Sequence, residues 1–210
     1  MLQVVNTTPY PATLSVFPSP TGVECAYAAV KISYDLSTGV PQLAASQAMF
    51  LVSDVYWGDP AGSSLRAAAD LTLLKPSTDV LLLGRAVAPA GPVQSMDVAL
   101  RVGTFGRRLR VFGERFWQRA GEGWRPSTPQ PFARLPLRWE LAFGGQSRAQ
   151  PDHPPECELR NPVGRGFVAS WDTDPVGLPL PCIEDPDALL GHPYERPEPV
   201  GVAPVAAAWL

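Results

Sequence analysis

Four residues in the second half of the chain have side chains that could bind a metal ion, namely His153, Cys157, Cys182 and His192. Thiolate and imidazole groups are common zinc ligands, and four of them complete a tetrahedral site. Their spacing is His-x3-Cys, then twenty-four residues, then Cys-x9-His, whereas zinc sites are built from closely spaced pairs. The pattern favours two histidines in polar loops and two incidental cysteines, so we expect neither a metal nor another cofactor.

Two carboxylates at the margins of apolar segments, Asp79 and Glu140, could form an acid–base pair with separated pKa values if the fold brought them together. The alternative is an ion pair or a turn cap, with Lys75 or Arg138 as partner, because half-buried carboxylates are normally paired. The chain has no Gly-x-Ser-x-Gly motif, and Cys25 has no histidine near it in sequence. We therefore expect a protein that is not an enzyme, with a hydrolase built on the carboxylate pair as the alternative.

Residues 161–167 read NPVGRGF and contain a Gly-x-Gly pattern. A phosphate-binding loop of this kind needs a strand before it and a helix after it, so that backbone amides and the helix dipole meet the phosphate. The residues that follow, VASWDTDP, are not a helix start. The segment is more typical of a glycine turn that allows tight backbone packing.

Residues 101–125 form the most basic segment, with seven arginines and two glutamates, and aromatic residues are interleaved with them. Arginines and aromatic rings suit a protein interface, a nucleic-acid surface, or a solvated strand face above core aromatics. The net charge of −3 argues against nucleic acid. We expect a contact surface for a protein partner, formed by Arg101, Arg107, Arg108, Arg110, Trp117 and Trp124.

The segments that must position these residues have the alternation of β-strands. Apolar side chains recur at every second position in residues 25–35, 96–102, 109–111 and 138–143, and a turn over 103–107 makes a hairpin of the middle two. Residues 80–83 form a continuous apolar run typical of a buried strand. With 18 glycines and 25 prolines in 210 residues, short strands joined by corners are favoured over helices.

We therefore expect a mainly β fold, an antiparallel sandwich-like or open-barrel domain over residues 1–145. Residues 146–210 lack periodicity and are rich in proline, which predicts an extended tail packed on that domain, so that the two make one structural unit. Phe167, Trp171, Ile183 and Trp209 are its expected anchors. Residues 150–198 carry ten acids and three arginines, so this segment could pair with the basic hairpin.

Several separated strings resemble one protein family. They are KPSTDVLLLGRAVAP from Lys75, LRVFGERFW from Leu109, PFARLPLRWELAFGG at 131–145 and NPVGRGF at 161–167. Together they are similar to the domain of unknown function found in type VI secretion gene clusters, over about residues 4–209. The chain departs from that family at Leu141, where arginine is usual, and at Cys182, where asparagine is usual.

The resemblance implies a non-catalytic adaptor or chaperone, of a family sometimes fused to pentapeptide repeats. Its partners would be a secreted toxic effector and the spike protein of the secretion apparatus, with no nucleic acid and no membrane insertion. A third possibility is a carbohydrate-binding module that uses exposed tryptophans. The first residues have no signal-peptide pattern and no apolar run approaches the ~18 residues of a membrane span. These features predict a bacterial cytoplasmic protein, and the apolar C-terminal residues suggest that the natural chain continues.

Overall fold

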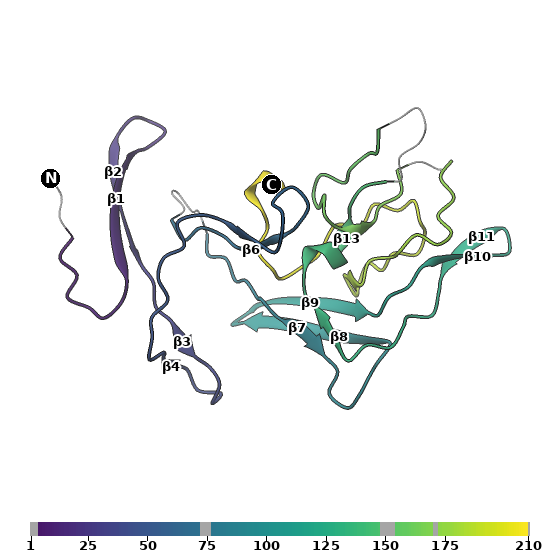
Figure 1. The fold of residues 1–210 in the computed structure, drawn as a ribbon, viewed down its shortest axis with the longest axis horizontal. Helices are drawn as coiled ribbons and strands as arrows, with labels where there is room; N and C mark the ends of the chain where they lie inside the picture. Colours follow the sequence, from purple (N-terminus) through teal and green to yellow (C-terminus); the bar gives the residue numbers. More distant parts are fainter. Residues whose placement is uncertain (1–3, 72–76, 148–153, 170–171, 210) are drawn as a thin grey trace. The chain divides into compact units, whose positions relative to one another are not determined.

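The structure, a computed structural model, describes residues 4–71, 77–147, 154–169 and 172–209 (Figure 1). Regular structure in these ranges is mostly short strands, with two 3-10 helices, η1 (Trp139–Leu141) and η2 (Ala207–Trp209). The fold is mainly β and its sheets are almost all antiparallel, as predicted, and they do not close into a barrel in the described ranges. None of the helices in these ranges is long and apolar enough to cross a membrane.

The chain divides into two compact units. Unit 1 is Met1–Asp54 with Ala68–Thr78, and unit 2 is Val55–Ala67 with Asp79–Leu210. This division does not coincide with the expected boundary at residue 145, because residues on both sides of that position belong to unit 2.

Unit 1 contains two hairpins. Strands β1 (Ala12–Pro18) and β2 (Glu24–Val30) pair antiparallel along their full lengths, and β3 (Tyr34–Asp35) pairs with β4 (Gln42–Leu43). The alternation predicted for residues 25–35 is thus realised in two strands. The β1–β2 turn is closed by the Ser19 N–H, which donates to the Val23 carbonyl at 2.7 Å, and Gly22 supplies a positive φ of 81°.

Unit 2 is built around a three-stranded sheet in the order β15-β9-β8, of which β8 and β9 are labelled in Figure 1. Strands β8 (Ser95–Val102) and β9 (Phe105–Phe112) form the predicted hairpin, and β15 (Ile183–Glu184) adds to the other edge of β9. The turn is shorter than the predicted 103–107, since pairing continues to Val102 opposite Phe105. Gly103, at φ 59°, allows a turn of two residues, so Arg107 and Arg108 lie in a strand and not in the turn.

In the described ranges, unit 2 also contains four smaller two-stranded sheets. They are β5 (Val55–Tyr56) with β6 (Leu65–Ala67), β7 (Arg85–Val87) with β12 (Arg134–Pro136), β10 (Trp117–Ala120) with β11 (Gly123–Pro126), and β13 (Phe143–Gly144) with β14 (Arg165–Gly166).

Two predicted strands are wrong. Residues 80–83 carry no strand. The run is not buried either, since only Leu82 packs on the core while Leu81 and Leu83 are about half exposed. Residues 138–143 turn into η1 before β13, because the Ala142 N–H bonds back to the Trp139 carbonyl at 3.1 Å.

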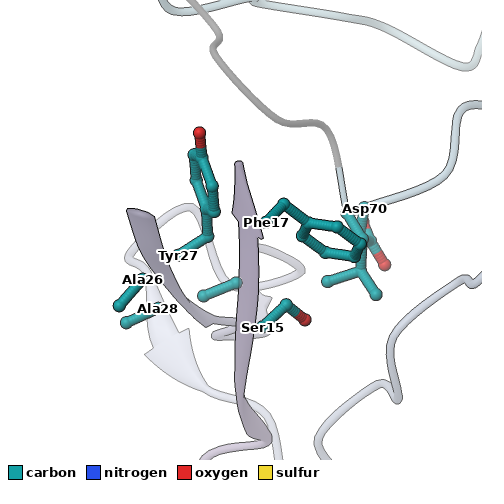
Figure 2. A pocket seen from close by; sticks show the side chains of 8 residues that line it. Ser15, Phe17, Ala26, Tyr27, Ala28 and Asp70 are labelled. Atoms are coloured by element: carbon teal, nitrogen blue, oxygen red, sulfur yellow. The ribbon is translucent and has the colours of Figure 1, made fainter. Parts of the chain in front are cut away.

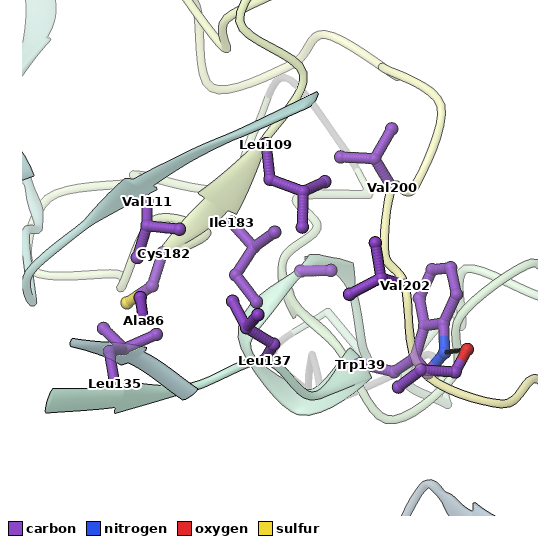
Figure 3. Close-up of a cluster of buried hydrophobic side chains, with 12 residues drawn as sticks. Ala86, Leu109, Val111, Leu135, Leu137, Trp139, Cys182, Ile183, Val200 and Val202 are labelled. Atoms are coloured by element: carbon purple, nitrogen blue, oxygen red, sulfur yellow. Dashed lines mark hydrogen bonds between the residues drawn. The ribbon is translucent and has the colours of Figure 1, made fainter. Parts of the chain in front are cut away.

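The main core of unit 2 joins the central sheet to the C-terminal segment (Figure 3). Leu109 and Val111 of β9 pack with Ile183, Val200 and Val202. The Trp139 indole Nε1 donates to the Ala203 carbonyl at 3.1 Å, which adds a polar tie to the same contact. The predicted tail therefore supplies part of the core itself and is not an extended layer upon it.

The four expected anchors of that segment differ in burial. Ile183 is fully buried, Phe167 is buried in a second cluster with Trp117 and Leu180, and Trp209 is half-buried. Trp171 lies outside the described residues.

The NPVGRGF segment packs against the AFGG segment through backbone groups, as the glycine-turn interpretation predicted. Strands β13 and β14 pair in parallel. Asn161 is fully buried, and its side-chain Nδ2 donates to the carbonyls of Trp139 and Phe143 at 2.9 Å each. A Cβ on Gly145 would overlap the carbonyl oxygen of Gly164, so the glycines are required by close approach of two backbones.

We expect Gly145→Ala to destabilise unit 2 by roughly 2–4 kcal/mol, because it adds steric overlap to a left-handed backbone conformation at φ 89°. Urea unfolding gives the free energy directly. The matched control is Gly177→Ala, which has a φ of 79° but no heavy atom within 4 Å of its new Cβ. Equal losses in the two variants would show that the close approach contributes nothing.

Candidate protein-binding surface

The predicted arginines of the β8–β9 hairpin lie on both faces of the sheet. Arg108 and Arg110 share the outer face with Asp97, because directly opposite residues of an antiparallel pair point the same way. Arg107 lies opposite Leu100 on the face that packs on the core, although its position near the hairpin end leaves it exposed.

Acids of the chain itself neutralise much of this surface. The Arg108 guanidinium Nη2 donates to both carboxylate oxygens of Asp187, at 2.8 and 3.1 Å, and Arg110 pairs with Asp97. Further pairs join Arg115 to Glu184 and Arg119 to Asp174. The predicted pairing of the acidic C-terminal segment with the basic segment is confirmed, and it leaves Arg101 and Arg107 as the hairpin arginines without an ion pair in the described chain.

The two predicted tryptophans differ in the surface they offer. Trp117 is 1% exposed in the second core cluster, so it is a core residue and cannot contact a partner in this structure. Trp124 is half-buried, with edge-on contacts to His192 and Tyr194 at centroid distances of 5.6 and 5.5 Å. The prediction that Trp117 contacts a partner is therefore wrong in this structure. The alternative, that the aromatic residues of this segment belong to the core, holds for Trp117.

Unit 1 has an apolar face on its β1–β2 hairpin. One face of the β1–β2 hairpin consists of apolar side chains from both strands, with Glu24 at its end. We call this face the apolar hairpin face. Its apolar residues are Ala12, Leu14, Val16, Pro18, Ala26, Ala28 and Val30. Val16 is 43% exposed and Val30 59% exposed. No buried hydrophobic residue of the described chain belongs to unit 1, so this hairpin displays the kind of face that strands normally bury.

A cavity of about 440 Å³ adjoins the hairpin within unit 1 (Figure 2). Phe17 and Tyr27, whose ring centroids are 6.5 Å apart, line it together with Ser15, Asp70 and Leu71. Figure 2 shows the Phe17 ring beside Asp70. The volume lies in the range of roughly 300–1,000 Å³ that is typical of ligand pockets, and the mixed lining suits an amphipathic side chain or a turn of a bound peptide.

Asp70 is held in place at the rim of this cavity. Its Oδ2 accepts from Lys31 Nζ at 2.5 Å and from the Leu51 N–H at 2.6 Å. Burial by itself would raise the pKa of Asp70, but these two donors outweigh it and the pKa is lowered. The carboxylate is therefore charged at neutral pH, and it links residues 68–71 to the sheet of unit 1.

The candidate metal ligands that the structure describes do not form a metal site. His153 lies outside the described residues. Cys182 is buried, and burial raises its thiol pKa to about 11, while Cys157 is half-buried with a pKa that burial also raises. In the described part of the chain, no three His, Cys, Asp or Glu side chains are placed to hold a metal ion.

The two candidate carboxylates have separate environments. Glu140 accepts from the backbone N–H of Ser64 at 2.8 Å and from its Oγ at 2.7 Å. Glu140 is thus satisfied by hydrogen bonds, but its partner is Ser64 and not the predicted Arg138 or Lys75. Lys75 lies outside the described residues. Asp79 is exposed.

Sequence reasoning missed a second group of cations in unit 2. Arg138 lies over the Trp57 ring with its Cζ 3.5 Å from the centroid, and Arg66 lies 5.3 Å from the same centroid. Trp57 and Arg138 are 81 positions apart in the sequence, so no local pattern marks the pair. The alternation over residues 138–143 placed Arg138 in a predicted strand, and no motif assigned a role to Arg66 or Trp57.

The structure is that of a mainly β protein with exposed apolar and cationic side chains. The chain belongs to a family described as an uncharacterized protein conserved in bacteria (DUF2169), whose model matches residues 21–210. Neither a curated protein nor a solved structure matches the chain.

Proposed function

We propose that this protein is a non-catalytic adaptor or chaperone that binds a toxic effector in the bacterial cytoplasm and helps to load it onto the spike of a type VI secretion apparatus. The resemblance of the four sequence strings motivates the choice of partner. The observation that carries the binding function is the apolar hairpin face of unit 1. A chaperone covers apolar segments of its client, and such a surface must be exposed before the client arrives.

The alternatives find less support in the geometry. A hydrolase would need a convergent acid–base pair, whereas both carboxylate oxygens of Glu140 are bound by Ser64. A carbohydrate-binding module would need exposed tryptophan platforms, and none of the described tryptophans is fully exposed. That the protein has no catalytic activity stays a prediction.

The proposed function predicts that Val16→Asp abolishes capture of the effector. A charge at the centre of the apolar hairpin face would be buried without a partner on binding, which costs several kcal/mol, so effector recovery should fall by more than tenfold. The effector to test is the toxin encoded beside this gene, co-expressed and recovered by affinity tag on the full chain, with the soluble fraction of the effector as a second readout.

The control is Thr13→Asp, because Thr13 is one of the residues on the opposite face of the same hairpin. It adds the same charge and should leave capture within about twofold of the unchanged protein. Equal capture by both variants would show that the hairpin face does not hold the effector. Failure of the unchanged protein to raise effector solubility or to recover it would overturn the adaptor function itself.

A further inference from the structure

A small pocket in unit 2 is lined by cationic and aromatic groups that the proposed function does not use. It encloses about 170 Å³, and its lining includes Trp57, Leu83, Arg85, Pro136, Leu137 and Arg138. Nucleotides and drug-sized ligands occupy pockets of roughly 300–1,000 Å³, so this one has room for a single side chain. The positive groups at its wall indicate that the side chain is anionic.

The pocket is held together by contacts between distant parts of the chain. The Trp57 N–H donates to the Ser64 carbonyl at 3.1 Å, and Ser64 in turn donates to Glu140. Because Glu140 follows Arg138 by two residues, these bonds place the Trp57 loop beside the Arg138 guanidinium. On the other side, the Leu137 N–H donates to the Gly84 carbonyl at 3.0 Å, which brings Arg85 alongside.

The stacking of Arg138 on Trp57 prepares it for a carboxylate. A guanidinium lying flat on an indole keeps its N–H groups at the edge, where they can form two parallel bonds with an anion. The ring also limits the rotamers of the arginine, so less side-chain entropy is lost when the anion binds.

Acids in the described part of the chain do not neutralise the cations around this pocket. Arg66, Arg85, Arg134 and Arg138 form no ion pair with any carboxylate of the described residues. Arg134 and Pro136 point to the same side as Arg85, which lies opposite Pro136 in the β7–β12 pair. Glu140 is the acid nearest to Arg138 along the chain, and both of its carboxylate oxygens already accept hydrogen bonds from Ser64.

We infer that Trp57, Arg85 and Arg138 form a recognition pocket for a carboxylate side chain in an acidic segment of a protein partner. Leu83, which is 50% exposed, adds an apolar rim that suits an aliphatic residue beside the acid. The chain carries a net charge of −3, which disfavours a long polyanion such as nucleic acid. That the occupant is a protein segment rests on the adaptor function proposed above, while the preference for a carboxylate rests on the pocket alone.

The test uses the full chain and a fluorescein-labelled peptide, acetyl-Glu-Leu-Glu-Glu-Leu-Glu-amide, with fluorescence anisotropy at low salt. The same peptide with glutamine in place of glutamate is the neutral probe. We expect the acidic peptide to bind and the neutral one not to bind, with affinity falling as salt screens the charges. The double variant Arg85→Ala/Arg138→Ala should weaken binding at least tenfold.

The matched control is Arg101→Ala/Arg107→Ala, which removes the same charge from the hairpin arginines that have no ion pair. It should change the affinity less than twofold. An equal or larger loss of affinity in this control would show that the acidic peptide binds to the β8–β9 hairpin or is attracted by the general charge of the protein. Either result would overturn the proposed pocket. Equal binding of the neutral peptide, or displacement by pyrophosphate but not by unlabelled acidic peptide, would overturn the carboxylate preference.

Folding of the variants is checked by thermal melting. Arg85 is exposed, so the Arg85→Ala variant should have the melting temperature of the unchanged protein. Its affinity for the acidic peptide should still be at least threefold lower. Arg138→Lys keeps the charge but loses the two parallel bonds, so intermediate affinity is expected. No effector is used in these measurements, so a negative result would not contradict the adaptor function. In the same way, a negative result in the effector-capture experiment would not contradict the carboxylate pocket.

Discussion

Replacing Ile183 with alanine is expected to destabilise all of unit 2 by about 2–5 kcal/mol, the usual loss for a fully buried aliphatic side chain. Ile183 is 1% exposed and packs in the main core, in register with Val111 of β9 and bridged to Ala142. A loss of that size is a large part of the stability of a domain. Urea unfolding, followed by tryptophan fluorescence, measures it.

Limited proteolysis distinguishes this expectation from a separately docked tail. In the variant, cleavage should appear together on both sides of residue 145, because the two segments share one core. Release of a C-terminal fragment while residues 79–145 stay resistant would contradict the shared core. Leu189→Ala is the control, since Leu189 is 45% exposed in the same segment and should cost less than about 1 kcal/mol.

Arg115→Met is expected to cost about 3–5 kcal/mol at neutral pH, since it leaves a buried carboxylate without its partner. The side chains of Arg115 and Glu184 are 7% and 3% exposed and form an ion pair. Glu184 also accepts from the Leu190 N–H at 2.8 Å, and Arg115 donates to the Pro181 carbonyl at 3.2 Å. The pair therefore joins the chain before β10 to β15, and Glu184 in turn holds the segment that follows β15 through Leu190.

The cost of Arg115→Met should depend on pH. Burial raises the pKa of Glu184, and Arg115 works against that rise. Without the arginine, the folded-state pKa rises further above the unfolded value of about 4.3. A raised pKa contributes stability that is present below the unfolded pKa and lost as pH rises through the folded one. The variant should thus lose less stability at about pH 4 than at about pH 7.

Urea unfolding of both proteins at the two pH values checks this dependence. The exposed pair of Arg119 and Asp174, 53% and 61% exposed, supplies the control. Arg119→Met should cost no more than about 1 kcal/mol. A loss for Arg115→Met that matches this control, or that grows toward acidic pH, would mean that the buried pair is not the source of the stability.

The β8–β9 hairpin shows what local pattern can predict. Alternation of Met96, Val98 and Leu100 with polar residues is a period-two signal that any antiparallel pair must obey, and the core does take these side chains. Its turn was placed less well, because Gly103 alone allows a two-residue turn that alternation does not reveal.

The main β class, the strand alternation in residues 25–35, the β8–β9 hairpin and the glycine contact of NPVGRGF follow from side-chain period and glycine conformation, which are properties of neighbouring residues. Tertiary structure decided which aromatic and cationic side chains are exposed and which already have a partner within the protein. It buried Trp117, paired Arg108 with Asp187, and stacked Arg138 on Trp57. Arg108 and Asp187 are 79 positions apart in the sequence, and Trp57 and Arg138 are 81 apart. The burial of Trp117 likewise depends on the assembled core, so no local pattern predicts these outcomes.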